Sequence, residues 1–253
     1  MRVLRLVPML ALALLLCGAA SPILVPDVSQ RQVDIRYSFK GAELLLFGAI
    51  AYPGGRVPDD PADIVVVLKG PERQIRLREK QKIAGIWVNV DSMRFQSAPS
   101  FYAIASSRPI NRITDERTAA IYELGIDNIQ LSPTSFTDSS EIQRFQRGLM
   151  DLQQRQELFV QQQGKVEITA GVLYRATLPL SSRAVVGNYT AETFLIQDGR
   201  VVAAAIRDIE VRKSGFERFI AAAAGDWPLL YGLTAIGVAV AMGMIAALVG
   251  RRY

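Results

Sequence analysis

The feature that most constrains this sequence is an uncharged run near its C-terminus, from Trp227 to Val249. As an α-helix rising 1.5 Å per residue, this run would reach about 34 Å, which is enough to cross the hydrocarbon core of a bilayer. It therefore predicts a transmembrane helix. Asp226 precedes the run and Arg251 and Arg252 follow it, and arginines beside a span mark its cytoplasmic end. We expect the bulk of the chain to lie on the opposite side of the membrane.

The first twenty residues have the pattern of a secretory signal peptide. Arg2 and Arg5 supply a positively charged start, Leu6 to Leu16 an apolar run, and Gly18 to Ala20 a small-residue cleavage zone. We expect cleavage near Ala20. The alternative is an uncleaved anchor, although the apolar run is short for a span and Pro8 interrupts it.

Charge and residue usage exclude several classes of function. The formal net charge is +5, but four of the 29 Lys and Arg residues flank the two apolar ends, where none of the 24 acidic residues lies. The remainder is nearly neutral, which argues against a nucleic-acid partner. The single cysteine, Cys17, lies in the leader, and the chain has no histidine. Catalytic sites and disulfides built on these residues are therefore excluded from the mature protein, and we expect no cofactor.

The exported segment is dominated by strand patterns. Apolar and polar residues alternate from Val33 to Lys40, and Asp63 to Lys69 is rich in β-branched residues. Asp198-Gly199 between two apolar runs predicts a hairpin. Further strands are expected at Leu44 to Ile50, Ile83 to Val90, Phe101 to Ala105, Val172 to Leu180, Tyr189 to Ile196 and Val201 to Val211. We predict a mainly β fold, an immunoglobulin-like antiparallel sandwich of one or two β units.

Two helices are predicted to interrupt the strands. Thr114 would cap a short helix that ends near Gly125, and Asp138 with Glu141 resembles a capping box at the start of a longer one. The longer helix is amphipathic, with an apolar stripe at Ile142, Phe145, Leu149, Leu152 and Phe159. We favour packing of this stripe on the sheet, and binding of a partner is the alternative.

These patterns divide the chain into seven segments. We predict a signal peptide at 1–20, a β-rich first half at 21–112, a helical insertion at 113–163, a β-rich second half at 164–213, a juxtamembrane segment at 214–226, a transmembrane helix at 227–249 and a cytoplasmic tail at 250–253. Phe216 and Phe219 in the juxtamembrane segment would allow it to lie at the lipid surface.

Three segments carry a resemblance to a known family. They are SFKGAELLLFGAI at Ser38 to Ile50, GIWVNVDSMRFQSAPSFYAIASSRPI at Gly85 to Ile110 and VGNYTAETFLIQDGRVV at Val186 to Val202, followed by KSGFERF at Lys213 to Phe219 and the span. In this order they resemble the "putative transmembrane protein" family of alphaproteobacteria. The resemblance implies a periplasmic β domain anchored in a Gram-negative inner membrane, and a link to permeases of the sulfite-exporter type. It supplies no catalytic residues.

Few residues qualify as a site. Small residues recur at four-residue steps in the span, at Ala235, Ala239, Gly243 and Ala247, and would let another helix approach closely. Chance is the alternative, because Ala and Gly are common there. The acidic loop with Asp59, Asp60 and Asp63 is better read as a solvated turn than as a calcium site, and Ser38 with Lys40 as a chance pair rather than a nucleophile. Trp87 is predicted to lie in the core.

The expected function is therefore non-enzymatic. We predict a single-pass protein of the bacterial inner membrane whose partners are the lipid bilayer and a polytopic membrane protein, with its C-terminus in the cytoplasm. The alternative is a periplasmic module or sensor that binds a solute or polymer and uses the helix as a tether. An enzyme relying on carboxylates, Ser, Lys or Tyr is a third hypothesis, without a supporting residue pattern.

Overall fold

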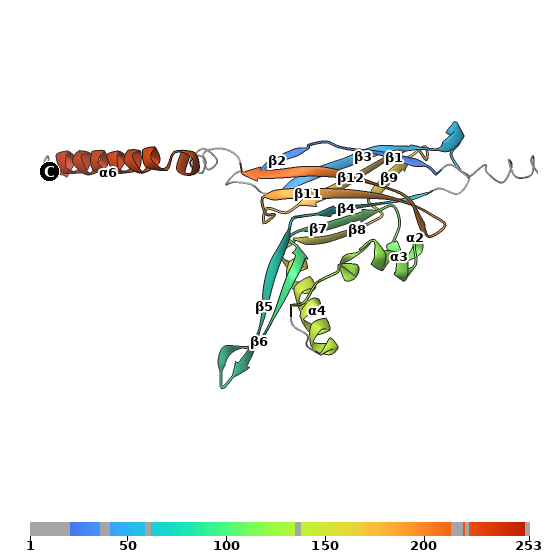
Figure 1. Cartoon of the computed structure of the whole chain (residues 1–253), viewed down its shortest axis with the longest axis horizontal. Helices are drawn as coiled ribbons and strands as arrows, with labels where there is room; N and C mark the ends of the chain where they lie inside the picture. The colour runs from blue at the N-terminus through green and yellow to red at the C-terminus, as the bar shows by residue number, and fades with distance from the viewer. Residues whose placement is uncertain are drawn as a thin grey trace, which may run out of the picture.

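Two β-sheets packed face to face form the body of the protein (Figure 1). The computed structural model describes residues 21–35, 41–58, 62–134, 138–213, 220 and 223–250. The predicted leader, the second half of the predicted strand at 33–40, most of the juxtamembrane segment, and Asp59, Asp60, Arg251 and Arg252 lie outside these residues. The mainly β fold predicted from the sequence is confirmed.

The larger sheet has six strands in the order β2-β12-β11-β4-β7-β8. Its centre is β4, which is buried along nearly its whole length because β11 and β7 flank it and both of its faces are covered. The pairs β12–β2 and β7–β8 at the two edges are parallel, a departure from a purely antiparallel sandwich. The strands are β2 (Gln32–Ile35), β4 (Asp63–Lys69), β7 (Tyr102–Ser106), β8 (Phe159–Gln163), β11 (Gly187–Gln197) and β12 (Arg200–Lys213).

The smaller sheet has four strands in the order β1-β3-β10-β9, all antiparallel. Along β10 buried and exposed residues alternate, since one face of the strand lies on the larger sheet and the other faces solvent. The strands are β1 (Ile23–Val28), β3 (Ala42–Ala51), β9 (Val166–Thr169) and β10 (Leu173–Leu180). The 3-10 turn η2 (Pro53–Gly55) follows β3.

One hydrophobic core joins the two sheets, so the described chain forms one sandwich rather than two β units. Three tyrosines, Tyr102, Tyr174 and Tyr189, are among its largest fully buried side chains. The Tyr189 hydroxyl donates to the carbonyl of Val185, four residues upstream, over 2.8 Å. This contact matches the tyrosine corner of immunoglobulin-like sandwiches. The predicted hairpin at Asp198-Gly199 is confirmed: both residues have positive φ, and they join β11 to β12.

A long two-stranded ribbon, β5 (Glu72–Ile83) with β6 (Ile86–Pro99), projects from the sandwich (Figure 1). It connects β4 to β7, and its strands pair with each other in a sheet of their own. Trp87, predicted to be a core residue, is 66% exposed near the tip of this ribbon. The prediction was wrong because an apolar run looks the same whether its strand lies inside the sandwich or extends beyond it.

The helical segment lies along the β7–β8 side of the larger sheet (Figure 1). It contains α2 (Ile110–Ile113), α3 (Glu116–Ile121), the 3-10 turn η3 (Ile126–Asn128) and α4 (Ser139–Arg155). The residue that caps α3 is Asp115, which accepts from the Thr118 backbone N–H over 2.8 Å, rather than the predicted Thr114. Thr114 instead donates its hydroxyl to the Gly199 carbonyl.

The long helix α4 is shorter than its sequence pattern suggested. It ends at Arg155, Glu157 adopts a positive φ, and Phe159 belongs to β8. Asp138 makes no hydrogen bond from its side chain to the backbone of the helix, so the predicted capping box does not form. The stripe itself is confirmed in its centre, because Phe145 and Leu149 are buried in the core.

Helix α6 (Pro228–Gly250) follows the β domain at its C-terminal end (Figure 1). Its bounds lie within one residue of the predicted span. Of the helices that the structure describes, α6 alone is long and apolar enough to cross a membrane. The qualifying window, Pro228–Ala247, has a mean hydropathy of 2.0 and is 0% buried by the rest of the protein. A helix this apolar, and not covered by its own domain, is suited to a lipid solvent.

Candidate functional site

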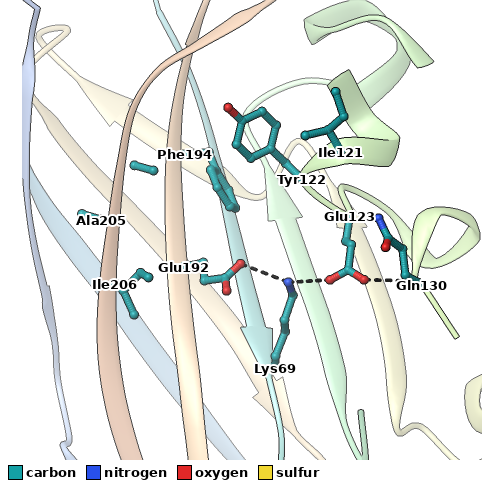
Figure 2. Close-up of a pocket in the computed structure, with 10 residues that line it drawn as sticks. Lys69, Ile121, Tyr122, Glu123, Gln130, Glu192, Phe194, Ala205 and Ile206 are labelled. Carbon is teal, nitrogen blue, oxygen red and sulfur yellow. Dashed lines mark hydrogen bonds and ion pairs between the residues drawn. The ribbon is translucent and has the colours of Figure 1, made fainter. Parts of the chain in front are cut away.

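An ion cluster of one lysine and two glutamates lies on the outer face of the larger sheet (Figure 2). Lys69 is the last residue of β4, Glu192 lies on β11, and Glu123 follows α3. In the β4–β11 register Lys69 is opposite Thr190, so Glu192 is its diagonal neighbour on the same face. The fold therefore brings together three charges that are far apart in the sequence.

Both glutamates contact the same ammonium group. The Lys69 Nζ lies 2.7 Å from Glu123 Oε2 and 3.1 Å from Glu192 Oε2. The three side chains are 23%, 24% and 21% exposed, respectively. Burial opposes the charge on Lys69, but the hydrogen bonds and negative charges of Glu123 and Glu192 outweigh it and raise the lysine pKa. Lys69 is therefore charged at neutral pH.

Glu123 is fixed in place by contacts at both ends. Its second carboxylate oxygen, Oε1, accepts from the backbone N–H of Gln130 over 2.9 Å. Its carbonyl accepts from the Tyr102 hydroxyl over 2.7 Å, and that hydroxyl in turn accepts from the Gly125 N–H over 3.0 Å. Burial raises the pKa of Tyr102, so its hydroxyl keeps its proton. Glu123 also has a positive φ of 53°, an uncommon conformation for a residue other than glycine.

A cavity of about 420 Å³ opens over the cluster. Besides the three charged residues, its lining is mainly apolar and includes Tyr122 and Phe194, whose rings meet edge to face with centroids 5.5 Å apart. A second cavity of about 340 Å³ on the other side shares Lys69, Glu123, Gln130 and Glu192 with the first. The cluster thus forms the wall between two hollows.

The chemistry of the cluster favours a cationic ligand over an anion. Two carboxylates and one ammonium give the site a net charge of −1, and both carboxylates are held by donors rather than left to the solvent. An amine in the cavity would donate to Glu192 beside Lys69, and the aromatic rings of Tyr122 and Phe194 suit apolar or cationic groups. No set of three or more acidic side chains among the described residues is arranged to hold a metal ion.

The predicted helix-packing residues belong to α6 and not to the ion cluster. Ala235, Ala239, Gly243 and Ala247 all lie on α6, where they are exposed. A Cβ built on Gly243 would meet no atom within 4 Å. The stripe is therefore present on the helix and uncovered by the described part of the chain. Arg251 and Arg252, on which the predicted orientation depends, lie outside the described residues.

Of the three aspartates in the acidic loop, the structure describes Asp63. Asp63, expected in a solvated turn, is instead the first residue of β4 and only 7% exposed. Its carboxylate accepts from Ser107 Oγ over 2.7 Å and from Arg108 Nε over 2.9 Å. The solvated turn was wrong for Asp63, whereas the strand predicted from Asp63 to Lys69 is confirmed as β4. Ser38 and Lys40 lie outside the described residues.

Comparison with known proteins identifies the family. The model of a family described as "Putative transmembrane protein (Alph_Pro_TM)" matches residues 23–252. The chain belongs to this family. Membership agrees with the apolar, exposed α6, and together they indicate a membrane-anchored protein of this transmembrane family.

Other comparisons add little. No functionally curated protein matches the chain. Among solved structures, it is similar to the 35 kDa C-terminal fragment of the major pilin GBS80 of Streptococcus agalactiae, with 14% sequence identity and a TM-score of 0.25. The match covers 76% of this chain and 56% of the pilin fragment, so the chain spans little more than half the length of that fragment. A TM-score this low does not establish a common fold.

Proposed function

We propose that this protein is an accessory subunit of the bacterial inner membrane, in which α6 docks on a polytopic partner and holds the β domain in the periplasm. The observation that carries the proposal is the exposure of α6: the rest of the described chain buries none of its candidate span. A span that does not pack on its own domain presents all its faces to lipid or to other helices. The partner we propose is a permease of the sulfite-exporter type.

The small-residue stripe supplies a contact face for this partner. Helices in a membrane gain nothing from burying apolar surface, so they associate through close backbone approach at small residues. Ala235, Ala239, Gly243 and Ala247 follow one another at four-residue steps and so lie along one side of α6. An open Cβ position at Gly243 means that substitution there leaves the protein itself undisturbed.

Co-purification in mild detergent tests the docking. Wild-type protein is expected to bring down a polytopic membrane protein, and Gly243→Leu is expected to lose it, because the leucine side chain holds the two backbones apart. Gly237→Leu is the matched control. Gly237 also meets no atom within 4 Å, but it lies about 160° round the helix from Ala235 and Ala239 and about 120° from Gly243, and its substitution should leave the partner bound. Equal recovery with Gly243→Leu, or no membrane partner with wild type, contradicts the proposal.

A second candidate function is the capture of a solute in the cavity over Lys69. It is favoured by the half-buried ion cluster and by the aromatic pair beside it, which together suit a solute with an amine and an apolar body. Sulfur oxyanions and other anions would meet the net negative charge of the site and are disfavoured.

Thermal unfolding of the full chain in detergent tests this alternative. A ligand that binds the folded state raises the midpoint, by an amount set by its concentration relative to its Kd. Hydrophobic amines should raise it, and Glu192→Gln should abolish the rise, whereas sulfite, sulfate and glycans should have no effect. Solute capture is contradicted if none of the amines raises the unfolding midpoint. It is also contradicted if an amine still raises the midpoint of Glu192→Gln.

A further inference from the structure

The tip of the β5–β6 ribbon is the most exposed apolar feature of the β domain. Ile83, Ile86 and Trp87 are 54%, 68% and 66% exposed, and Val88 is 39% exposed. In a protein of this size, single exposed apolar residues are ordinary, but a contiguous cluster at the end of a projection marks an interaction site. The ribbon carries this cluster away from the sandwich (Figure 1).

The turn at the tip determines on which face of the ribbon each of these side chains lies. Ala84 and Gly85 form a two-residue turn in which both have positive φ, 49° and 86°. Across it Ile83 pairs with Ile86 and Lys82 pairs with Trp87. Because paired residues share a face, the two isoleucines lie on one face of the ribbon and Trp87 lies beside Lys82 on the other. The tip is therefore apolar on both faces.

Helix α4 contacts the ribbon a few residues before the tip. On α4, Arg144 contacts Glu79 over 3.4 Å and Asp91 over 3.2 Å, and these two acidic residues pair across the ribbon. Towards the sandwich, Met93 and Phe95 are buried. From Lys80 to Val90, between Glu79 and Asp91, every residue of the ribbon is exposed.

The charge beside the apolar tip is positive. Lys80 and Lys82 follow Glu79 on β5, while Glu79 and Asp91, the acidic residues next to them, already contact Arg144. A tryptophan and aliphatic residues at an end, with lysines just behind, is the composition that settles at the boundary between acyl chains and anionic headgroups. A protein partner would not require that ordering of apolar and basic residues along the projection.

The position of the tip agrees with a lipid occupant. Along the long axis of the molecule, the tip lies at the same end as the end of β12, from which the chain continues towards α6 (Figure 1). The ribbon points mainly across this axis, and its tip is level with the end of the β domain that leads to the bilayer crossed by α6 (Figure 1). We propose that the tip of the β5–β6 ribbon inserts into the headgroup region of that bilayer and gives the β domain a second membrane contact. This proposal rests on α6 crossing the same membrane.

Fluorescence of the full-length protein in lipid vesicles tests the contact. The chain has two tryptophans, so Trp227→Phe leaves Trp87 as the only reporter. Lipids brominated on the acyl chains should reduce Trp87 emission about twofold or more, as expected for a side chain buried about 5–10 Å into the interface. Aqueous acrylamide should quench it weakly. Adding an anionic lipid should increase the bromolipid quenching, and Lys80→Gln with Lys82→Gln should remove that increase.

A matched control places the reporter at the other end of the domain. Arg200 is exposed at the start of β12, beside the turn, and Arg200→Trp in a Trp87→Phe, Trp227→Phe background should respond to acrylamide and not to bromolipid. Trp87 emission that is unchanged by bromolipid overturns the proposal, and so does shielding of Trp87 that grows with protein concentration, which would indicate contact between copies. If the protein fails to float with the vesicles, both this contact and the anchoring by α6 are overturned.

Discussion

Replacing Lys69 by methionine should destabilise the β domain through the two carboxylates it leaves behind. Methionine keeps most of the apolar stem, so the loss is confined to the charge. Lys69 donates to Glu123 over 2.7 Å and contacts Glu192 over 3.1 Å. Hydrogen bonds to charged groups contribute about 1.5–3 kcal/mol each. Each of the three side chains is still about a quarter exposed to solvent, so we take the lower end of this range for each contact. For the two contacts together we expect a loss of about 3 kcal/mol in unfolding free energy.

Urea unfolding of the full chain in detergent, followed by the far-ultraviolet circular dichroism of the strands, measures this loss. Neutralising one carboxylate in Lys69→Met with Glu192→Gln should recover about half of it, because the remaining Glu123 keeps the backbone N–H of Gln130 as a donor.

The control is Lys165→Met, at an exposed lysine on the protein surface, which should change stability by no more than about 0.5 kcal/mol. The reasoning is refuted if Lys69→Met costs as little as this control. It is equally refuted if the deficit is the same after Glu192→Gln, because the loss would then come from packing and not from unpaired charge.

Three further predictions concern the sandwich, and unfolding of the full chain in urea measures each. Gly48→Ala should cost about 2–3 kcal/mol, because its Cβ would lie 2.5 Å from the Val25 carbonyl oxygen and 2.6 Å from the Tyr174 hydroxyl; an unchanged midpoint would contradict this packing. Leu149→Ala, at a side chain 1% exposed, should cost about 3 kcal/mol, and a loss below about 1 kcal/mol would show that α4 is loosely packed. Burial raises the pKa of Tyr189 from 10.0 to about 12, so its contribution is complete below pH 10 and is lost by about pH 12. Between these two pH values Tyr189 should make the unfolding free energy fall by about 1.4 kcal/mol per pH unit. Tyr189→Phe should remove this fall, and an unchanged pH dependence would contradict the burial.

The sequence predicts those elements whose local pattern has a single interpretation. The uncharged run gives α6 to within one residue, and Asp198-Gly199 gives a hairpin that the structure confirms. The amphipathic stripe places Phe145 and Leu149 in the core. In each case the physical requirement acts within a few residues: a lipid solvent, a turn with positive φ, or one helical face.

Features that depend on tertiary placement are the ones that local patterns miss. The parallel edge pairs bring together strands distant in sequence, and no local pattern encodes them. The end of α4 at Arg155 was missed because Phe159 continues the apolar register in β8. Trp87 was misplaced because strand propensity does not say whether a sheet covers the strand.

The ion cluster was also missed, although one signal was available. Lys69 ends a strand that is otherwise apolar from Ile64 onwards, and a lysine at such a position needs a carboxylate partner. The sequence does not say which of its 24 acidic residues supplies it. Glu123 and Glu192 are brought to Lys69 by the crossover through α3 and by the β4–β11 register, both of which are properties of the whole fold.

Site-specific labelling tests the central claim that α6 crosses the membrane with the β domain outside the cytoplasm. In a Cys17→Ser background the chain has no other cysteine, so single cysteines introduced at Asp198 and at Tyr253 report the two sides. A membrane-impermeant maleimide should label Asp198→Cys in spheroplasts and should label Tyr253→Cys only after lysis. Labelling of Tyr253→Cys in intact spheroplasts with Asp198→Cys protected, or release of the protein from membranes by alkaline carbonate, would contradict the account.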